Sequence, residues 1–582
     1  MKKTSMISLA LALCLLLSLL AGCGGTGTQT GSDAAPASAV SGAEPAAAEA
    51  APAAAPEAAA PTEAGSAQEP AEEPTEAEPV YEKVEVALPI TDGGETISMY
   101  LLLPPFITAM VERPNDLTVL GELEKRTGLT FDITPGNYID GQTDVNLLIA
   151  GGTYPDLINH ADLYSNGIDA AVNEEIVIDL KDRIENDMPN LLASLKAYDV
   201  DVIKQMTTDS GYIAYFPQIH KEPYVDNFAI VVRKDLVEEN GLEIPETFDE
   251  FHDFLTALKD ASGMQFGFSN DGFDQAMITG LNLGPAGTVG AESLRVIDGE
   301  LEYCGVADEM RQYLEMARDW YAEGLLYSDF ISYESFMQGN MVTAGNTLFG
   351  FSNGNAQTIQ EGLVNGIDLI PIPYPTPSAG DEIKIHGSGE VVRCAAWSVS
   401  TQCSEENLDL ICQLVDYIFS DEGTLLFNYG AEGEAFRYGD NGEPEWTDLI
   451  LDYAGGTTTA CMIYATATPA EYIPGIYDDS KFDYSYTDTM VEIEDMIDNA
   501  STGEYDYPIG ADNRISSEDL LTAAALSSDL STYVSTTILS WIHGQTELND
   551  QTWQEYVDTC YAMNLQDIID IYQEGYDVFM AE

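Results

Sequence analysis

The sequence predicts an α/β protein built around mainly parallel sheets, and three observations support this prediction. Short apolar runs alternate with amphipathic segments from about residue 96 onward, which is the order typical of strands followed by helices. Roughly 500 residues follow residue 80 and are rich in Tyr, Phe, Leu and Ile, which is enough for two sizeable lobes. The segment before residue 80 differs in composition and is predicted to lie outside the folded body.

The first 22 residues have the features of an export signal. Two lysines precede an apolar run, Ile7–Leu20, that is too short to cross a bilayer core of about 30 Å as a stable span. The run ends in the letters LAGC at residues 20–23, which resemble the bacterial lipobox, whose cysteine is acylated and becomes the mature N-terminus. We therefore predict a signal peptide at 1–22, a lipid on Cys23, and a position on the extracellular face of the cell membrane. The alternative is an ordinary signal peptide with an incidental cysteine.

Residues 23–80 are predicted to form a disordered tether. Between Gly24 and Pro79 the segment is rich in Ala, Pro and Glu, and it contains no aromatic residue, no Lys and no Arg. Such a composition cannot bury enough apolar surface to offset the entropy lost on ordering. An alanine-rich helix is the alternative, but a proline every few residues interrupts it.

Acidic residues dominate the chain, with 99 Asp and Glu against 22 Lys and Arg and a net charge of −77. This balance excludes nucleic acid as a partner, because phosphate recognition needs clustered Lys and Arg. We interpret the acidity as a solvated shell that keeps an extracellular protein soluble, a property that a salty medium would also favour. No stretch has the spacing of a calcium-binding EF-hand loop, so no metal site is predicted.

No motif in the sequence identifies an enzyme. The chain lacks the GxSxG, P-loop and HExxH patterns and has no GxGxxG after a strand. Its five histidines stand far apart in sequence, so no local metal pair is predicted, and no cofactor is expected. The six cysteines after residue 23 include no CxxC pair, which leaves both disulfides and buried free thiols open.

The body of the chain begins with an alternation of strands and helices. Apolar runs predict the strands, and amphipathic segments ended by glycine predict the helices. Strands are expected at 96–103, at 129–133 and from Pro155-Asp156 onward, and helices at 116–127, closed by Gly128, and at 145–150. In sheets of this kind ligands bind beyond the carboxyl ends of the strands.

A strand–helix–loop–helix unit spans residues 228–260. Residues 228–232 are the predicted strand, and Gly241 ends the helix that follows it. Thr247 and Glu250 have the spacing of a capping box. Five apolar side chains then follow one face of a helix and are predicted to be core: Phe248, Phe251, Phe254, Leu255 and Leu258.

This unit resembles the RKD-L…GL-x-x-P-x-T-x-x-E-F block of extracellular solute-binding proteins, the family that delivers sugars to ABC importers. Four more places agree with that family in the same order. They are LIAGGTYPD at 148–156, FMQGNM at 336–341, NYGAEG at 428–433, and the closing segments at 539–544, 553–557 and 571–576. One departure is Asn340, which stands where the family usually has Lys.

The resemblance implies a type 2 periplasmic-binding-protein fold. In this fold two α/β lobes are joined by crossover strands, and the ligand binds in the cleft between lobes that close about a hinge. Motif order places lobe one at 81–221 with 371–429, and lobe two at 222–370 with 430–582. The main crossings would lie at 215–217 and 370–373, whose prolines suit strands that leave a sheet.

Candidate ligand residues are polar and aromatic side chains just past the strand ends. Flat rings fit the faces of a sugar, and carboxylates, amides and guanidinium groups fit its hydroxyls. The candidates are Asn159, His160, Asp162, Tyr215, Asn346, Phe349, Phe351, Arg393 and Trp397. The structural alternatives are a core position for Phe349, Phe351 and Trp397, a satisfied histidine for His160, and an ion pair for Arg393. Asp156 is predicted to cap its turn.

Arg393 is of particular interest because basic residues are scarce in this chain. In a cleft, a guanidinium group can bind the carboxylate of a uronic acid through two parallel hydrogen bonds.

The sequence therefore predicts a non-enzymatic, membrane-tethered receptor. It would capture a carbohydrate, in particular an oligosaccharide, as a monomer, and would deliver it to the permease of an ABC importer. Two alternatives remain: the same fold with a different ligand, such as a peptide or an amino-sugar derivative, and a surface glycan adhesin or glycoside hydrolase.

Overall fold

The computed structural model describes most of the chain after residue 80. The described residues are 81–104, 111–138, 140–198, 200–224, 229–262, 277–283, 289–326, 349–352, 366–381, 383, 390–439, 441–453, 457–464, 473–478, 481, 507–508 and 510–581. The chain divides into two units, Met1–Ala77 and Glu78–Glu582, and every described residue belongs to the second. The predicted signal peptide, Cys23 and the tether lie outside the described residues. Among the helices that are described, none is long and apolar enough to cross a membrane.

A six-stranded sheet carries the first of two large cores. Its strand order is β13-β4-β10-β3-β1-β2. The strands are β1 (Thr96–Leu103), β2 (Thr130–Asn137), β3 (Leu157–Ile158), β4 (Phe216–Tyr224), β10 (Glu390–Val399) and β13 (Gly475–Tyr477). β10 is antiparallel to both of its neighbours, and the other strands run parallel to one another. β1, β2 and β3 therefore end on the same side of the sheet, as the sequence predicts.

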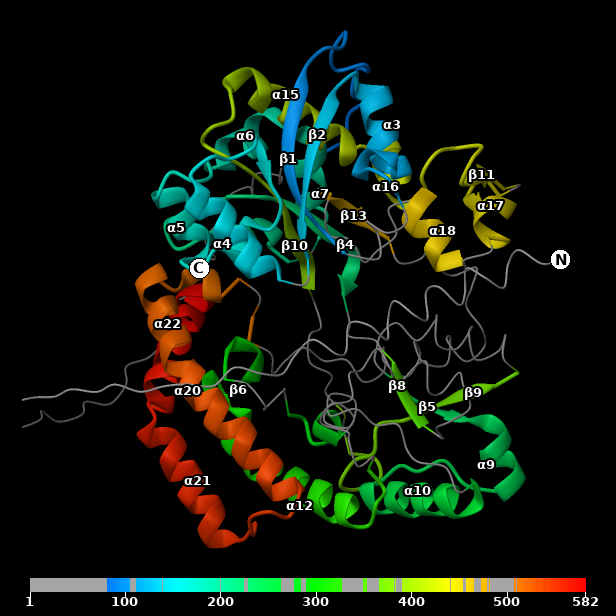
Figure 1. Ribbon diagram of the computed structural model, residues 1–582, viewed down its shortest axis with the longest axis vertical. Helices are drawn as coiled ribbons and strands as arrows, with labels where there is room; N and C mark the ends of the chain where they lie inside the picture. Colours follow the sequence, from blue (N-terminus) through cyan, green and yellow to red (C-terminus); the bar gives the residue numbers. More distant parts are fainter. Residues whose placement is uncertain are drawn as a thin grey trace, which may run out of the picture. The chain divides into compact units, whose positions relative to one another are not determined.

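Helices flank this sheet (Figure 1). They are α3 (Thr118–Thr127), α4 (Gly141–Gly151), α5 (Gly167–Asn173), α6 (Lys181–Asp187), α7 (Pro189–Leu195), α8 (Val202–Met206), α15 (Glu405–Ile418) and α16 (Asp421–Tyr429). A parallel strand that is covered on both faces is apolar along its length. This explains β1, in which every residue from Met99 to Leu103 is buried.

Glycines end two helices where the sequence predicts. Gly128 follows α3 with φ of 80°, and Gly241 follows α9 (Lys234–Asn240) with φ of 60°. Both adopt the left-handed conformation, which costs glycine no steric energy. At Gly128 a Cβ atom would also lie 2.3 Å from the carbonyl oxygen of Thr91, so a larger residue would not fit there.

The second core combines small antiparallel sheets with long helices. One sheet has the order β8-β5-β9, and β6 pairs with β7 in a separate hairpin. The strands are β5 (Ala229–Arg233), β6 (Leu294–Ile297), β7 (Glu300–Tyr303), β8 (Phe349–Ser352) and β9 (Leu369–Ile372). The remaining helices are α10 (Phe248–Ser262), α12 (Asp308–Ala322), α20 (Ser517–Ile542), α21 (Asp550–Ala562) and α22 (Leu565–Ala581). Both α20 and α21 contact α22 (Figure 1).

Helix α10 begins with the predicted capping box. The backbone N of Glu250 donates to Thr247 Oγ1 at 3.3 Å, and the backbone N of Thr247 donates to Glu250 Oε2 at 3.2 Å. The five apolar side chains predicted to be core are all buried within this second core: Phe248, Phe251, Phe254, Leu255 and Leu258. The strand–helix–loop–helix prediction is therefore confirmed.

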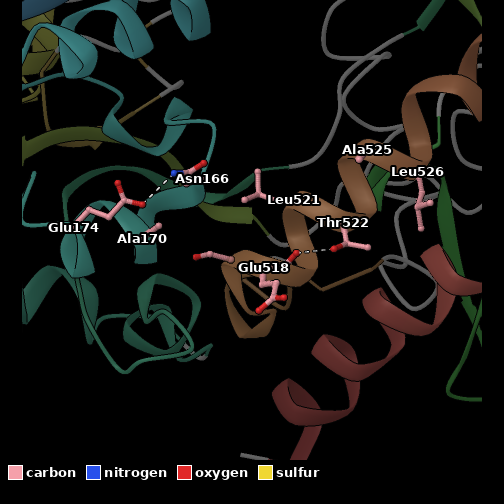
Figure 2. A pocket seen from close by; sticks show the side chains of 9 residues that line it. Asn166, Ala170, Glu174, Glu518, Leu521, Thr522, Ala525 and Leu526 are labelled. Carbon is pink, nitrogen blue, oxygen red and sulfur yellow. Dashed lines mark hydrogen bonds between the residues drawn. The ribbon is translucent and has the colours of Figure 1, made fainter. Parts of the chain in front are cut away.

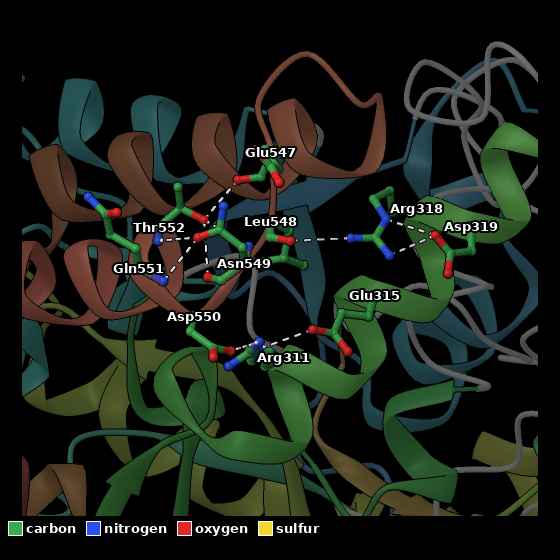
Figure 3. A network of polar contacts seen from close by, with 10 residues as sticks. All are labelled: Arg311, Glu315, Arg318, Asp319, Glu547, Leu548, Asn549, Asp550, Gln551 and Thr552. Atoms are coloured by element: carbon green, nitrogen blue, oxygen red, sulfur yellow. Dashed lines mark hydrogen bonds and ion pairs between the residues drawn. The ribbon is translucent and has the colours of Figure 1, made fainter.

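A polar network fastens α12 to the start of α21 (Figure 3). Arg311 donates to Asp550 Oδ1 at 2.6 Å and to Glu315 Oε1 at 3.1 Å. Arg318 donates to the backbone oxygen of Leu548 at 3.4 Å. These two arginines of α12 therefore hold the start of α21 in place at the surface of the second core.

The chain passes between the two sheets more than once. β4 lies in the six-stranded sheet and β5 in the three-stranded one, and the chain returns from β9 to β10. A small third core surrounds Trp446. It contains β11 (Phe436–Tyr438), β12 (Pro444–Trp446), α17 (Asp448–Leu451) and α18 (Thr457–Tyr464). The lobe boundaries drawn from motif order remain a proposal.

Candidate functional site

Strands β4 and β10 extend past the edge at which β1, β2 and β3 end. Ile158, the last residue of β3, pairs with Ser398 of β10. From Trp397 back to Glu390, however, β10 continues to pair with β4, and β13 joins β4 over Gly475–Tyr477. We call this extension the β4–β10 ribbon. It starts at the sheet edge where ligands bind in folds of this kind.

Two polar side chains near β3 hold the neighbouring strands in place. The side chain of Asn159 is fully buried: its Oδ1 accepts from Leu102 N at 3.0 Å, and its Nδ2 donates to Ala396 O at 2.6 Å. Asp156 Oδ2 accepts from the backbone N and the Oγ of Ser98 at 2.8 and 2.7 Å. These contacts fix β1 and β10 beside β3. The role of Asp156 is structural, but its carboxylate binds Ser98 of β1 and does not cap its own turn as predicted.

The chain turns at His160 and presents Asp162 at the edge of the sheet. His160 has a left-handed backbone, with φ of 53°, which is uncommon for a residue other than glycine. Its backbone N donates to Ala395 O at 3.3 Å, and its Nδ1 lies 3.6 Å from Asp162 Oδ1. Asp162 belongs to the short helix η3 (Ala161–Leu163) and is exposed. The turn therefore places an accessible carboxylate just beyond β3.

Four ionisable side chains, which we call the acidic recess, are linked by their electrostatic influence on one another: Asp162, Tyr215, Tyr507 and Asp512. Burial raises the pKa of the Tyr215 phenol, and the nearby carboxylates of Asp162 and Asp512 raise it further. Burial also raises the pKa of Tyr507, with a contribution from Asp512. Both phenols are therefore protonated at physiological pH, when each has a hydroxyl hydrogen to donate.

Asp512 is accessible to solvent and yet closely surrounded by protein. The residue is exposed, but desolvation by the surrounding chain raises the pKa of its carboxyl group.

The acidic recess joins residues of both large cores. Tyr215 belongs to the first core, whereas Tyr507 packs against the second. Asp512 lies in the short helix η8 (Asp512–Arg514), which contacts α22. Asn513 of the same helix donates through Nδ2 to the backbone oxygen of Gln205, which lies in α8, at 2.8 Å. A ligand in the recess would therefore touch both cores at once.

A second group of side chains, the cationic cluster, lies on the β4–β10 ribbon and consists of His220, Arg393, Tyr477 and Lys481. The Arg393 Cζ and the Lys481 Nζ lie 4.5 and 3.6 Å from the centre of the Tyr477 ring. His220 pairs with Tyr477 between β4 and β13, and the two rings meet edge to face with centroids 5.8 Å apart. The electron-rich face of an aromatic ring attracts cations, which favours this arrangement.

The position of Lys481 is fixed by packing, because the residue is only 1% exposed. Its ammonium group donates to Asn428 Oδ1 at 3.2 Å. The charged groups of Arg393 and Lys481 lie 4.5 and 3.6 Å from the centre of the same Tyr477 ring. At the largest separation that these distances allow, the two charges repel by about 2 kcal/mol for an effective dielectric constant near 20. The ring and the Asn428 carbonyl help to offset this repulsion.

The positive potential of the cationic cluster affects His220. Burial lowers the pKa of its imidazole to about 4, and the charges of Arg393 and Lys481 contribute to the decrease. The imidazole is therefore neutral at physiological pH, and the cations are the charged members of the cluster.

Residues 106–425 match the profile of the family described as "Bacterial extracellular solute-binding protein". The chain belongs to this family.

Two curated relatives of this solute-binding protein are described by the carbohydrates that they bind. The fructooligosaccharide ABC transporter substrate-binding protein FusA of Streptococcus pneumoniae is 23% identical over 498 residues, covering 80% of this chain and 88% of the relative. The polygalacturonan/rhamnogalacturonan-binding protein YtcQ of Bacillus subtilis is 21% identical over 345 residues, covering 57% of this chain and 66% of the relative.

Solved structures of solute-binding proteins share the fold. An HMO-binding, ABC-transporter-associated protein from Bifidobacterium longum infantis matches with a TM-score of 0.68 and 18% identity, over 84% of this chain and 99% of that one. An alginate-binding protein matches with a TM-score of 0.66 and 20% identity, over 85% and 100%. The predicted solute-binding-protein fold is confirmed.

The structure brings some of the predicted site residues together and keeps others apart. Asp162 is near enough to Tyr215 to raise the pKa of its phenol, and Arg393 lies in the cationic cluster. Asn159 and His160 connect β3 to β10, while Trp397 is fully buried in the first core. The backbones of Phe349 and Phe351 lie in β8, but their side chains and the whole of Asn346 are outside the described residues. The ligand contacts of all nine residues remain predictions.

Sequence reasoning missed the partners that come from distant parts of the chain. They are His220, Tyr477, Lys481, Tyr507 and Asp512. One available signal was the scarcity of basic residues after Arg437, where only Lys481 and Arg514 follow. The other partners required the pairing of β13 with β4 and the position of η8, which local sequence does not reveal.

A further pocket of about 540 Å³ lies between α5 and α20 (Figure 2). Glu174 lines it from the α5 side, where its Oε1 accepts from Asn166 Nδ2 at 3.0 Å, and Glu518 lines it from α20. Leu521 contributes an apolar side chain that is 42% exposed. Since α5 belongs to the first core and Leu526 of α20 packs against the second, movement between the cores would change this pocket.

Proposed function

We propose that this solute-binding protein captures a carbohydrate, in particular an oligosaccharide, and delivers it to the permease of an ABC importer. Membership of the solute-binding-protein family supports this function. The relative that covers most of the chain is described as a fructooligosaccharide ABC transporter substrate-binding protein. The protein would act by binding and release, without chemical change of the sugar.

The acidic recess is the observation that carries the proposal. It combines two tyrosines with two carboxylates; Asp162 follows β3 and Tyr215 precedes β4 of the six-stranded sheet. Carboxylates accept hydrogen bonds from sugar hydroxyls, phenols donate to them, and aromatic rings cover the apolar face of a sugar ring. Because the recess joins both cores, a bound sugar would favour the arrangement in which the cores are close, and closure would be a population shift.

The proposed location is the extracellular face of the cell membrane. A signal peptide at 1–22, a lipid on Cys23 and a flexible tether at 23–80 would keep a monomeric receptor close to its permease at high effective concentration. Labelling of expressing bacteria with a radioactive fatty acid tests the anchor. The wild-type chain should incorporate the label and Cys23→Ala should not; equal labelling of both would refute it.

A thermal-shift screen of the full-length chain, purified in detergent, tests the carbohydrate proposal. Ligands that bind only the folded state stabilise it by about 2.7 kcal/mol at a hundredfold excess over Kd. We expect a higher melting temperature with at least one class of oligosaccharide. Tyr215→Ala should remove the effect, and Tyr438→Ala, at a 50% exposed tyrosine of β11, should keep it. A shift with peptides alone would refute the carbohydrate proposal, and hydrolysis of the glycan would refute the absence of chemistry.

A further inference from the structure

A junction of three helices fastens η8 and the last turn of α22 to α8. Helix α8 contributes Val202 and Met206 to the first core, whereas α22 belongs to the second core through Ile568 and Ile569. Helix η8, which carries Asp512, contacts α22. The junction is therefore a contact between the two cores, and it is made by the segment that contains one carboxylate of the acidic recess.

Side chains of η8 bind backbone oxygens at the end of α8. Asn513 Nδ2 donates to the backbone oxygen of Gln205 at 2.8 Å. The guanidinium group of Arg514 donates to the backbone oxygen of Lys204 at 3.1 Å and to that of Thr207. The last carbonyl groups of a helix have no donors within the helix, and a cation is favourable at that end. Arg514 is buried, so the junction is shielded from water.

The last turn of α22 completes the junction. The centre of the Phe579 ring lies 4.2 Å from Lys204 Nζ and 5.7 Å from Arg514 Cζ. Lys204 Nζ also donates to the backbone oxygen of Phe579. An aromatic face attracts cations within about 6 Å of its centre, so this ring favours one arrangement of both side chains. Helix α22 thus supports the same side chain, Arg514, that fastens η8 to α8.

Two glycines allow the chain to pack this closely. A Cβ atom on Gly510 would lie 2.5 Å from the backbone oxygen of Gln205, and one on Gly575 would lie 2.8 Å from that of Ala511. Neither approach leaves room for a side chain. The two residues before Asp512 are therefore packed against α8 and α22.

We propose that this junction positions Asp512 for ligand binding, so that Phe579 at the end of α22 controls the affinity for the captured carbohydrate. The inference rests on the proposed function, in which the acidic recess binds hydroxyls of the ligand. The carboxylate of Asp512 is near enough to Tyr215 to raise the pKa of that phenol, and its Oδ1 accepts from the backbone N of Asn513 at 3.1 Å. Asn513, Arg514 and Phe579 would be positioning residues, because they act through Asp512.

Positioning affects affinity through entropy and geometry. A carboxylate that is already held where it binds loses little conformational freedom when the ligand arrives. If the junction is weakened, η8 gains freedom relative to the first core, and the carboxylate of Asp512 spends less time beside Tyr215. Binding must then restore the order that the junction provides in the wild-type chain.

A double-mutant cycle, measured by titration calorimetry on the full-length chain, tests the inference. The probes are neutral oligosaccharides of glucose, xylose and fructose, of which the tightest binder is used. Asn513→Ala and Phe579→Ala should each weaken binding by about three- to tenfold, as expected for coupled residues. Neither change should weaken binding further in Asp512→Ala, since no carboxylate is left to position. Phe579→Tyr keeps the ring and should bind as the wild type does.

A second measurement needs no ligand. Desolvation by the surrounding chain raises the pKa of the Asp512 carboxyl group. Carbon NMR of the chain labelled at its aspartate carboxyl groups measures this pKa, and Asp512→Asn assigns the signal. In Phe579→Ala the pKa should move down towards the ordinary value of an aspartate, because a released η8 is better hydrated.

Two variants of the second core serve as controls. Asn240→Ala removes an amide whose Nδ2 donates to the backbone oxygen of Leu236 at 2.7 Å within α9. Tyr561→Ala removes a 44% exposed ring of α21. Both should leave the affinity and the pKa of Asp512 unchanged. The melting temperature of each variant without ligand shows whether it is folded.

The results that would contradict the inference differ in what they say of the proposed function. Wild-type affinity in both Asn513→Ala and Phe579→Ala, or losses that persist in full in Asp512→Ala, would overturn the positioning role and leave carbohydrate capture intact. An unchanged pKa of Asp512 in Phe579→Ala would also overturn it. If neither these probes nor any other oligosaccharide of the thermal-shift screen binds the wild type, the proposed function fails, and the control of affinity fails with it.

Discussion

The acidic recess and the cationic cluster are built around tyrosines near the same strand, β4, but their charges are opposite. Burial shifts both groups most, but nearby carboxylates add to the raised pKa of Tyr215 in the recess, whereas cations add to the lowered pKa of His220 in the cluster. The recess exposes the carboxylates of Asp162 and Asp512, whereas Lys481 of the cluster is only 1% exposed. The difference teaches that opposite charges beside one strand can have different uses: the carboxylates can accept from sugar hydroxyls, and the cations pack against a ring of β13.

The largest expected effect is the pH dependence of stability that His220 of the cationic cluster causes. The pKa of His220 is lowered from 6.5 to about 4 in the folded protein, so between these values the unfolded chain binds more protons than the folded one. Stability must therefore rise with pH across this window, by roughly 3 kcal/mol from this residue, and must be lost as the pH falls towards 4. Denaturant unfolding of wild type and His220→Gln between pH 4 and 7 measures the difference. Parallel pH profiles would contradict the assignment.

Removal of a ring from each site should separate their roles. Tyr215→Ala is expected to weaken every bound oligosaccharide about 30-fold or more, as loss of a central aromatic contact typically does. Tyr477→Ala should leave the affinity almost unchanged, because its ring packs against cations rather than sugar. Calorimetry of both variants with the same oligosaccharide provides the measurement. Equal losses in the two variants would remove the distinction.

A smaller effect is expected when one carboxylate of the recess is neutralised. Asp512→Asn keeps the size of the side chain and one acceptor oxygen, but it loses the charge-assisted hydrogen bond, so affinity should fall about tenfold. Asp319→Asn is a suitable control, because this residue pairs with Arg318 on α12, in the second core. If Asp512→Asn binds as wild type, Asp512 does not contact the ligand.

Much of the fold could be predicted because local signals agree with the tertiary structure. The apolar run 96–103 has the bounds of β1, Gly128 ends α3, and the capping box at Thr247 starts α10. Boundaries were less accurate where pairing overrides local signals. β2 was expected to end at 133, but it continues to Asn137 because it stays in register with β1 through Pro135 and Gly136. Helix α4 likewise starts at Gly141 rather than at 145.

The candidate site was only partly predictable, for a physical reason. Residues that follow a strand end, such as Asp162, are found from the alternation of strands and helices. The contact between His220 and Tyr477 depends on the pairing of β4 with β13, which are separated by more than 200 residues of chain. Asp512 influences the pKa of Tyr215 because η8 is fastened to α8 through Asn513 and Gln205. Such contacts are properties of topology, and a single sequence carries no local trace of them.

The β4–β10 ribbon has a mechanical consequence. Its pairing is irregular at three places, between Glu390 and Val392, between Val392 and Cys394, and between Ala395 and Trp397. Irregular pairing bends and twists a ladder that would otherwise be stiff. The ribbon is thus a flexible connection between the two well-packed cores. Any bending of the ribbon is distributed over several peptide units. The pivot of the receptor would then be a length of strand rather than a single residue.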